Sequence, residues 1–299
     1  MSSKLVVKDN ALINASYSLS LVEQRLVLLA IIEARKTNYT KDYSERLTIT
    51  ANSYMQQFNV ERQTAYEMLK QASDKLFERR FSYQEQRDKG VANITSRWVS
   101  EVAYVQDTAV VEIVFAPAVI PLITELEKHF TSYEIEQVAG LNSGYAVRLY
   151  EILIAWRGVG AVPEMELQTL RERLGVEPNE YQRMHHFKAR VLDLAISQIN
   201  EHTDITARYE QHKTGRKITG MSFTFNHKTK PIKQVKLTPK QIETYSSKLA
   251  RLSSLGSKSP KGATYDDYAK QIADELKTDD GVRKYLPYLI EAGFKSNGY

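Results

Sequence analysis

The sequence predicts an α+β protein with two tandem winged helix-turn-helix domains and a C-terminal, partly helical tail. A helix followed by a basic β-hairpin is predicted between residues 181 and 225, and the first half repeats the same order of elements. Beyond about residue 230 the composition changes. We therefore expect one domain at residues 1–130, a second at 131–230, and a linker with a small helical tail at 231–299.

The helix of the second domain has one apolar and one polar face. Apolar side chains recur at spacings of three and four residues, namely Met184, Phe187, Val191, Ala195 and Ile199. The opposite face holds Gln182, Arg183, His186, Arg190, Asp193 and Ser197. Alternating apolar residues then predict two strands, with Ile205, Ala207 and Tyr209 on one and Met221, Phe223 and Phe225 on the other.

The predicted hairpin has a basic tip at residues 212–217, where Lys213, Arg216 and Lys217 are firmly charged. In winged helix-turn-helix proteins such a helix enters the major groove, and the wing contacts the backbone or the minor groove. The pattern fits ordinary α+β structure with solvated cations equally well. The charge distribution favours DNA: residues 181–240 carry 12 Lys and Arg against 4 Asp and Glu, whereas the whole chain is only +5.

The first half predicts a similar series. Ser20 and Glu23 have the spacing of a capping box, which starts a buried helix that runs to about Lys36. A short helix at 52–58 and a turn at 59–60 precede a long helix at 61–79. Strands are expected at 43–50, 81–87, 94–106 and 110–115, and a helix at 117–127.

The second half repeats this order, with helices at 143–156 and 168–174, a short strand at 165–167, and the long helix from 181 to 200. Aligning Phe58-Asn59-Val60 with Leu174-Gly175-Val176 matches short helix, turn, long helix and hairpin in both halves. Because identity is low, this is a repeat of pattern rather than of sequence. The two domains are expected to meet near residues 128–140.

The tail predicts a helix at 239–252, a flexible linker at 253–262, and a small helical appendage at 265–277 and 282–292. A solvated or disordered extension is an equally good interpretation of this stretch. Its role is left open.

Composition excludes several kinds of site. Cysteine is absent, which excludes disulfides, thiolate zinc sites and cysteine nucleophiles. The first ten residues contain no apolar segment of a secretory signal, and the longest apolar run, Leu26 to Ile32, is far shorter than a membrane span. We therefore expect a cytoplasmic protein without a membrane partner.

Several segments together resemble the iteron-binding plasmid replication initiators. They are Ser143–Glu151 (SGYAVRLYE), Phe187–Ala195, Ile199–Ile205 and Lys213–Lys217, preceded by Val7–Ile13 and Leu21–Arg25. The resemblance covers roughly residues 5–228, in the family's order and spacing. It implies two winged-helix domains, with repeated origin sites bound mainly by the second and dimerisation largely through the first. It also implies that monomers open the origin while dimers repress, and that host replication proteins such as a helicase or initiator are recruited.

The expected DNA contacts follow from the two matched helices and wings. The second domain offers Arg183, His186, Lys188 and Arg190 on its long helix and Lys213, Arg216 and Lys217 on its wing. Lys188 lies nearest the apolar edge of the helix and extends to a phosphate or packs its stem. The first domain offers Arg62, Gln63, Tyr66 and Lys70, which contact DNA or belong to a dimer surface.

Catalytic motifs are missing. The chain has no Gly-Lys dipeptide and hence no Walker A loop. No two of its six histidines are separated by one residue, the spacing of rolling-circle nucleases. We expect a binding protein without catalytic residues, cofactor or metal. The rivals are a winged-helix transcriptional regulator without a role in replication and a nicking or strand-transfer enzyme.

Overall fold

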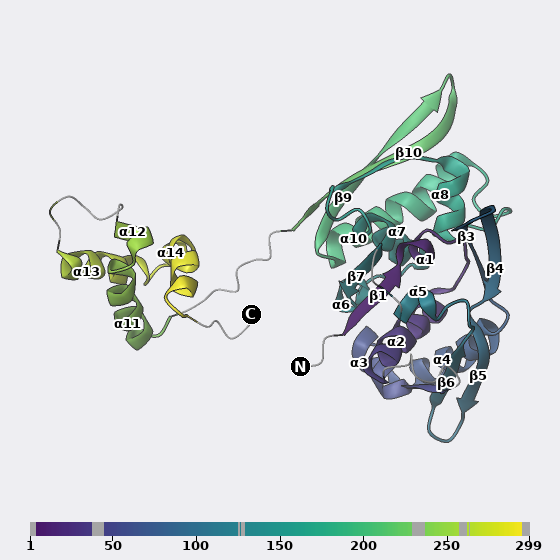
Figure 1. Cartoon of the computed structure of the whole chain (residues 1–299), viewed down its shortest axis with the longest axis horizontal. Helices are drawn as coiled ribbons and strands as arrows, with labels where there is room; N and C mark the ends of the chain where they lie inside the picture. The colour runs from purple at the N-terminus through teal and green to yellow at the C-terminus, as the bar shows by residue number, and fades with distance from the viewer. Residues whose placement is uncertain are drawn as a thin grey trace. The chain divides into compact units, whose positions relative to one another are not determined.

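The computed structural model describes residues 4–37, 45–124, 126, 129–228, 237–256, 262 and 264–294, without the side chains of Asp279 and Arg283. The chain forms two compact units, residues 1–228 and 229–299 (Figure 1). Each unit is described by itself.

The first half of the larger unit mixes helices with short strands (Figure 1). Its elements are β1 (Leu5–Asp9), α1 (Asn10–Ile13), α2 (Leu21–Thr37), β2 (Leu47–Thr50), α3 (Ala51–Phe58), α4 (Arg62–Leu76), β3 (Arg80–Arg87), β4 (Gly90–Arg97), β5 (Val99–Val105), β6 (Val110–Phe115) and α5 (Pro121–Thr124). The predicted capping box of α2 is confirmed, because the Ser20 amide donates to Glu23 Oε2 at 2.6 Å and the Glu23 amide to Ser20 Oγ at 3.3 Å.

Three predictions for this half are wrong in detail. The helix expected at 117–127 begins only at Pro121, since residues 117–120 form turns. The long helix, expected at 61–79, begins at Arg62 and ends at Leu76. The single strand expected at 94–106 is two strands: β4 pairs with β3, and β5 pairs with β6 in a different sheet. Trp98 lies between the two strands and is fully buried. Its ring centre is 4.9 Å from that of Tyr17 and 5.0 Å from that of Phe81. Burying this indole holds the chain at the point where it changes sheets.

The second half contains β7 (Phe130–Glu134), α6 (Glu136–Ala139), α7 (Gly144–Ile154), β8 (Ala161–Glu166), α8 (Leu167–Leu174), α9 (Met184–Phe187), the π-helical turn η1 (Lys188–Leu192), α10 (Asp193–His202), β9 (Ile205–Thr214) and β10 (Lys217–His227). The predicted repeat is confirmed, since α3, α4 and the β3–β4 hairpin are matched by α8, the α9–η1–α10 helix and the β9–β10 hairpin. Residues 43, 44, 125, 127 and 128 of the predicted elements lie outside the described residues.

The four sheets are small and their described pairings are all antiparallel. The strand orders are β2–β6–β5, β3–β4, β8–β10–β9 and β1–β7. The last pair joins the start of the chain to residues 130–134, with Val7 opposite Ser132. This pairing holds β1 beside the helix α7 that follows β7.

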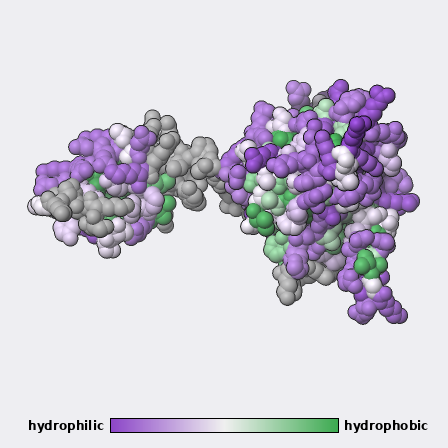
Figure 2. Space-filling model, turned by 90° about the horizontal axis from the view of Figure 1, so that it is seen from above, coloured by the Kyte–Doolittle hydropathy of each residue, from purple (hydrophilic) through white to green (hydrophobic). Residues whose placement is uncertain are grey.

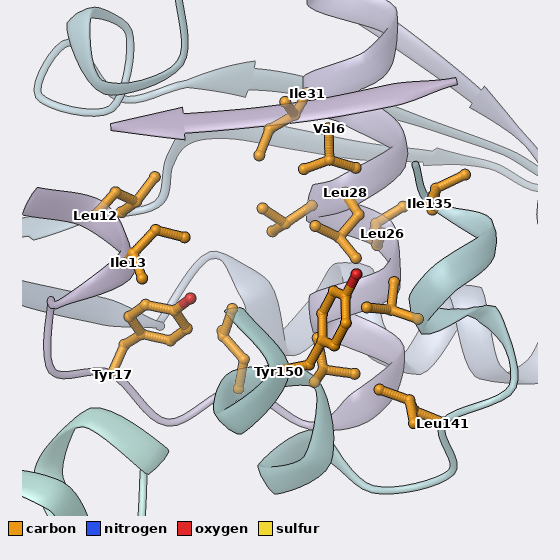
Figure 3. Packing of buried hydrophobic residues seen from close by; sticks show 14 of the residues in the cluster. Val6, Leu12, Ile13, Tyr17, Leu26, Leu28, Ile31, Ile135, Leu141 and Tyr150 are labelled. Atoms are coloured by element: carbon orange, nitrogen blue, oxygen red, sulfur yellow. The ribbon is translucent and has the colours of Figure 1, made fainter. Parts of the chain in front are cut away.

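A single continuous core extends through both halves of this unit. Figure 3 shows Val6 of β1 with Leu26, Leu28 and Ile31 of α2, near Tyr150 of α7. These side chains are all buried, and the same cluster reaches Phe225 in β10. The hydrophobic effect therefore favours keeping the two halves together as well as folding each one.

A buried charge cluster also joins the halves. Lys8 Nζ lies 2.6 Å from Glu151 Oε1, which also accepts from Tyr133 Oη at 2.6 Å. Arg148 Nη1 lies 2.9 Å from Glu151 Oε2, and its Nη2 donates to the carbonyls of Ile13 and Ala15 at 2.9 Å each. Burial disfavours the charged form of Glu151, but Lys8 and Arg148 outweigh it and hold the pKa of this carboxyl below its usual value.

The smaller unit is helical and has a core of its own. It contains α11 (Pro239–Ala250), α12 (Ser253–Gly256), α13 (Tyr265–Glu275) and α14 (Asp279–Glu291), packed around Leu249, Tyr268, Ile272 and Leu289. Capping boxes at Thr238 and Thr264 start α11 and α13. The predicted helices are confirmed, but the expected linker is helical over its first four residues. Residues 257–261 and 263 lie outside the described residues.

Among the described helices, none combines the length and the apolar character needed to cross a membrane.

Candidate nucleic-acid interface

The turn before the long helix of the second domain is fixed by an arginine. Arg171 of α8 donates from Nη2 to the Glu180 carbonyl at 2.6 Å and from Nη1 to the Tyr181 carbonyl at 3.1 Å. Its guanidinium also lies 4.8 Å from the centre of the Phe187 ring. Tyr181 has a φ of +41° and is not helical, so the helix begins at Met184 rather than at 181 as predicted. Arg171 therefore holds the loop that leads into the helix.

The helix contains a π-helical turn that the sequence pattern does not reveal. In an α-helix, each residue is rotated around the helix axis by about 40° relative to the residue four positions before it. The wider π-turn over Lys188–Leu192 rotates less per residue and offsets part of that rotation. As a result Phe187, Val191, Ala195 and Ile199 are all buried, as the spacing predicts.

The predicted helix contacts lie mostly in solvent. Arg183, His186 and Arg190 are exposed, and Lys188 and Arg190 both belong to the π-turn. Lys188 is half-buried, with Nζ 6.0 Å from the centre of the Tyr209 ring on β9. Its ammonium group thus faces an aromatic ring of the wing, and a phosphate contact by Lys188 stays a prediction.

The wing is a long two-stranded ribbon whose far end projects beyond the rest of this unit (Figure 1). β9 pairs with β10 along its whole length, from Ile205 opposite His227 to Thr214 opposite Lys217. The turn between the strands is therefore shorter than the tip predicted at 212–217. Gly215 supplies the positive φ of +61° that the tight turn needs. Lys213, Arg216 and Lys217 are all exposed.

A hollow of about 490 Å³ lies between the helix and the wing. It is lined by Arg171 of α8, Gln182 and Met184 at the start of the helix, and Lys217 and Thr219 of β10. The structure thus brings the start of the helix and the part of the wing next to its turn to one surface. Cations on both sides of a hollow are the arrangement that holds a nucleic-acid backbone.

Two neighbouring contacts adjust the charge of this surface. Tyr209 Oη donates to Asp193 Oδ1 at 2.7 Å, which engages the carboxylate at the start of α10. Burial and that carboxylate raise the pKa of Tyr209 above its usual value, so the hydroxyl stays a donor. Lys228 donates to the carbonyls of Asn200 and Thr203 at the end of α10. It therefore caps a helix instead of facing DNA.

The first-domain set is placed differently. Arg62, Gln63 and Lys70 are exposed on α4 and Tyr66 is half-buried. Arg62 Nε donates to Tyr66 Oη at 3.0 Å, and Gln63 Nε2 donates to Glu67 Oε1 at 2.7 Å. Figure 1 shows α4 and the β9–β10 ribbon at opposite ends of this unit. The structure does not bring these four residues onto the surface formed by the second helix and its wing.

Within the part of the chain that the structure describes, no three His, Asp or Glu side chains form a cluster that could hold a metal ion. The rings of His185 and His186 lie 4.0 Å apart at the start of the helix. They add polar surface next to Arg183.

Sequence reasoning missed the supporting residues. Arg171 lies on α8, outside the basic segment, and its hydrogen bonds to Glu180 and Tyr181 depend on the path of the loop. Arg148 and Glu151 lie within the SGYAVRLYE segment, but their partners are in β1 and the segment after α1. A charged i, i+3 pair in an otherwise apolar helix is the signal that points to such a buried cluster.

The sequence matches two models of one protein family. The sequence model described as "Initiator Replication protein, WH1" matches residues 5–154, and "Initiator Rep protein, WH2" matches residues 166–225. The chain belongs to the initiator replication protein family. The predicted α+β fold with two winged-helix domains is thereby confirmed, as is the resemblance drawn from the sequence. The WH1 match of this chain continues through β7 and α7, and the boundary at residue 130 stays a prediction.

Individual relatives agree with this membership. A replication initiation protein of Escherichia coli is 28% identical over 155 residues, which are 52% of this chain and 48% of that protein. The chain thus spans about half the length of that relative. An uncharacterized 27.6 kDa protein of Escherichia coli is 24% identical over 226 residues, 72% of this chain and 93% of its own.

Two solved structures are also similar. The WH1 domain of a replication protein isolated from a multiple sclerosis patient is 62% identical, with a TM-score of 0.31, over 36% of this chain and 81% of that domain. The Pi initiator protein in complex with iteron DNA is 19% identical, with a TM-score of 0.55, over 76% of this chain and 99% of that one. The second likeness is one of fold.

Proposed function

We propose that this chain is a plasmid-type replication initiator that binds repeated origin sequences. The observation that carries the proposal is the surface formed by the α9–η1–α10 helix and the β9–β10 wing, in a chain of the initiator family. Arg183, His186 and Arg190 face the major groove, and Lys213, Arg216 and Lys217 follow the backbone. Lys188 extends to a phosphate or packs its stem beside the wing.

The first domain has a supporting role in this proposal. Glu61 directly precedes α4 and Glu67 lies on it among the cations. Three of the four candidate residues, Arg62, Gln63 and Tyr66, form hydrogen bonds within the helix. We therefore assign Arg62, Gln63, Tyr66 and Lys70 to auxiliary DNA contact or to the surface used in dimerisation. The monomer–dimer equilibrium, repression by the dimer, recruitment of a host helicase or initiator, and a cytoplasmic location belong to the same proposal.

The first test is a binding titration against the repeated DNA upstream of the gene, across a salt series. Repeat-specific binding with a steep loss of affinity at higher salt supports the proposal. Equal, weak binding to all sequences contradicts it. A scrambled fragment of the same length and base composition is the matched control.

Replication itself requires a second test. A plasmid that carries the gene and its upstream repeats, without another origin, should transform and persist in a suitable host. A chain that binds the repeats but never sustains the plasmid would be a regulator only. Incubation with supercoiled origin DNA and divalent metal should give neither nicks nor a covalent tyrosyl adduct, because we assign the chain no catalytic step.

A further inference from the structure

A second hollow of about 490 Å³ lies at the junction of the two winged-helix domains. One wall is the β3–β4 hairpin of the first domain, with Ser82, Gln84 and Asn93, and the other is α8 of the second domain, with Thr169 and Arg173. Figure 1 shows α8 next to this hairpin. The segment after β1, including Asn14, completes the lining, which is mainly polar.

Arg173 is a cation without a described partner. It is half-buried, and among the described residues no carboxylate or carbonyl accepts from its guanidinium. Burial lowers the pKa of Arg173, and the charge of nearby Arg148 lowers it further. Glu172 also lines the hollow, but its carboxylate accepts from Gln168 Nε2 at 2.8 Å and forms no ion pair with Arg173. Guanidinium groups in such surroundings are normally paired with an anion.

The charge behind the hollow has the same sign. The buried cluster holds two cations, Lys8 and Arg148, against the single carboxylate of Glu151. Arg148 Nε donates to the Arg173 carbonyl at 3.0 Å, so the cluster adjoins this residue directly. An excess of positive charge in a poorly solvated region attracts an anion more strongly than the same charge in water.

Neutral donors are also available. Gln84 Nε2 donates to Asn93 Oδ1 at 3.1 Å. Both side chains line the hollow, and among the described residues the Asn93 amide nitrogen has no acceptor. A guanidinium fork together with an amide matches the several acceptor oxygens of a phosphate group.

We propose that this hollow is a binding site for a phosphate group, held by the Arg173 guanidinium between the two domains. The phosphate comes either from the backbone of bound DNA or from a free phosphate ion. Either source would neutralise the excess charge and connect the β3–β4 hairpin to α8. The test has two parts. The melting measurement with free phosphate does not depend on the proposed function, whereas the DNA-binding measurement rests on it.

The first arm measures melting of the full chain in inorganic phosphate against chloride at equal ionic strength. We expect phosphate to raise the melting temperature of the wild type more than that of Arg173→Gln, which experiences the same general salt effect. Arg173→Lys, which keeps the charge without the fork, should give an intermediate response. Arg35→Gln, an exposed arginine at the end of α2, is the control and should respond like the wild type.

The second arm measures the salt dependence of binding to the repeated DNA. If a DNA phosphate occupies the site, Arg173→Gln should reduce the slope of log affinity against log salt by about one. Loss of the phosphate response with an unchanged slope assigns the site to a free phosphate. A phosphate response that is equal in wild type and Arg173→Gln overturns the proposal, whatever the slope. If the wild type fails to bind repeated DNA, the proposed function fails and the first arm still decides this one.

Discussion

At the scale of single residues, charged side chains have two separate tasks. Arg190 and Lys213 are exposed in the π-turn and the wing, whereas Arg148 and Glu151 are fully buried between the two halves of the larger unit. Exposed cations bind a partner at little cost in stability, but a buried charge must be paired to be tolerated. The two groups should therefore respond to substitution in different assays.

Replacing Arg190 tests base recognition. Arg190→Ala should cost about 1–3 kcal/mol of binding free energy and relax the preference at one base position, because a guanidinium reads a guanine with two hydrogen bonds. Competition binding against single-base variants of the repeat measures this. Arg35→Ala, with the same change in charge outside the interface, should leave both affinity and preference unchanged.

Replacing Lys213 tests backbone contact. Lys213→Ala should weaken binding to all sequences alike and reduce the salt slope by about one, since a lysine on a phosphate releases one counterion. Titrations at several salt concentrations give the slope. A selective loss at one base position would instead place Lys213 against a base edge.

Glu151 makes stability depend on pH. Its folded pKa lies below the usual value near 4.5, so its contribution is present above that pH and is lost as the pH falls through the folded value. Glu151→Gln should lower the free energy of unfolding at neutral pH by about 3–5 kcal/mol, because Lys8 and Arg148 lose their counter-charge. The difference between wild type and variant should shrink below about pH 4. Urea unfolding at several pH values measures both. Glu33→Gln is the control and should change little, because Glu33 is only half-buried and pairs with Lys36 at the surface.

At the scale of elements, the sequence predicts what depends on local pattern and misses what depends on distant contacts. The spacing of Phe187, Val191, Ala195 and Ile199 identified the buried face of the helix, and the alternation from Ile205 to Phe225 identified the wing. The same spacing predicts neither the π-turn nor the start of the helix at Met184. The passage from β4 to β5 depends on where Trp98 is buried, so periodicity cannot separate the two strands.

The candidate site shows the same limit. Exposed cations on the helix and wing could be predicted because amphipathicity separates them from the core. The cluster of Lys8 and Glu151 could not, because its members lie 143 residues apart. The position of Arg173 across a hollow from the β3–β4 hairpin depends on how the two domains pack, which no local pattern encodes.

The turns of the second domain offer a matched pair of glycines. Gly175 and Gly215 have φ values of +78° and +61°, but a Cβ on Gly175 would lie 2.4 Å from the Tyr17 carbonyl oxygen, whereas one on Gly215 would meet nothing within 4 Å. Gly215→Ala should cost about 1–2 kcal/mol for the left-handed backbone alone. Gly175→Ala should cost about 1–3 kcal/mol more from the overpacked contact. Denaturant unfolding compares the two, and equal losses would contradict the close approach of the segment before α2.

At the scale of the whole molecule, the surface of the larger unit suits a protein that binds charged partners. Figure 2 shows that the face in view is covered mostly by hydrophilic residues, with hydrophobic residues in small separate patches. A surface of this kind associates through charge and hydrogen bonds more than through apolar burial. The family models match only residues within the larger unit, and the smaller unit lies outside both matches.

The smaller unit should unfold separately, because its core contains only its own residues, grouped around Ile272. Ile272→Ala removes a fully buried side chain and should destabilise this unit by about 2–5 kcal/mol. The larger unit should keep its own unfolding transition, because its core from Val6 to Phe225 shares no residue with the smaller one. Calorimetry of the full chain should show one transition moved to lower temperature and one unchanged. Ile31→Ala in α2 is the reciprocal variant and should move only the other transition. If either variant moves both, the two units fold as one and the smaller unit is part of the DNA-binding body.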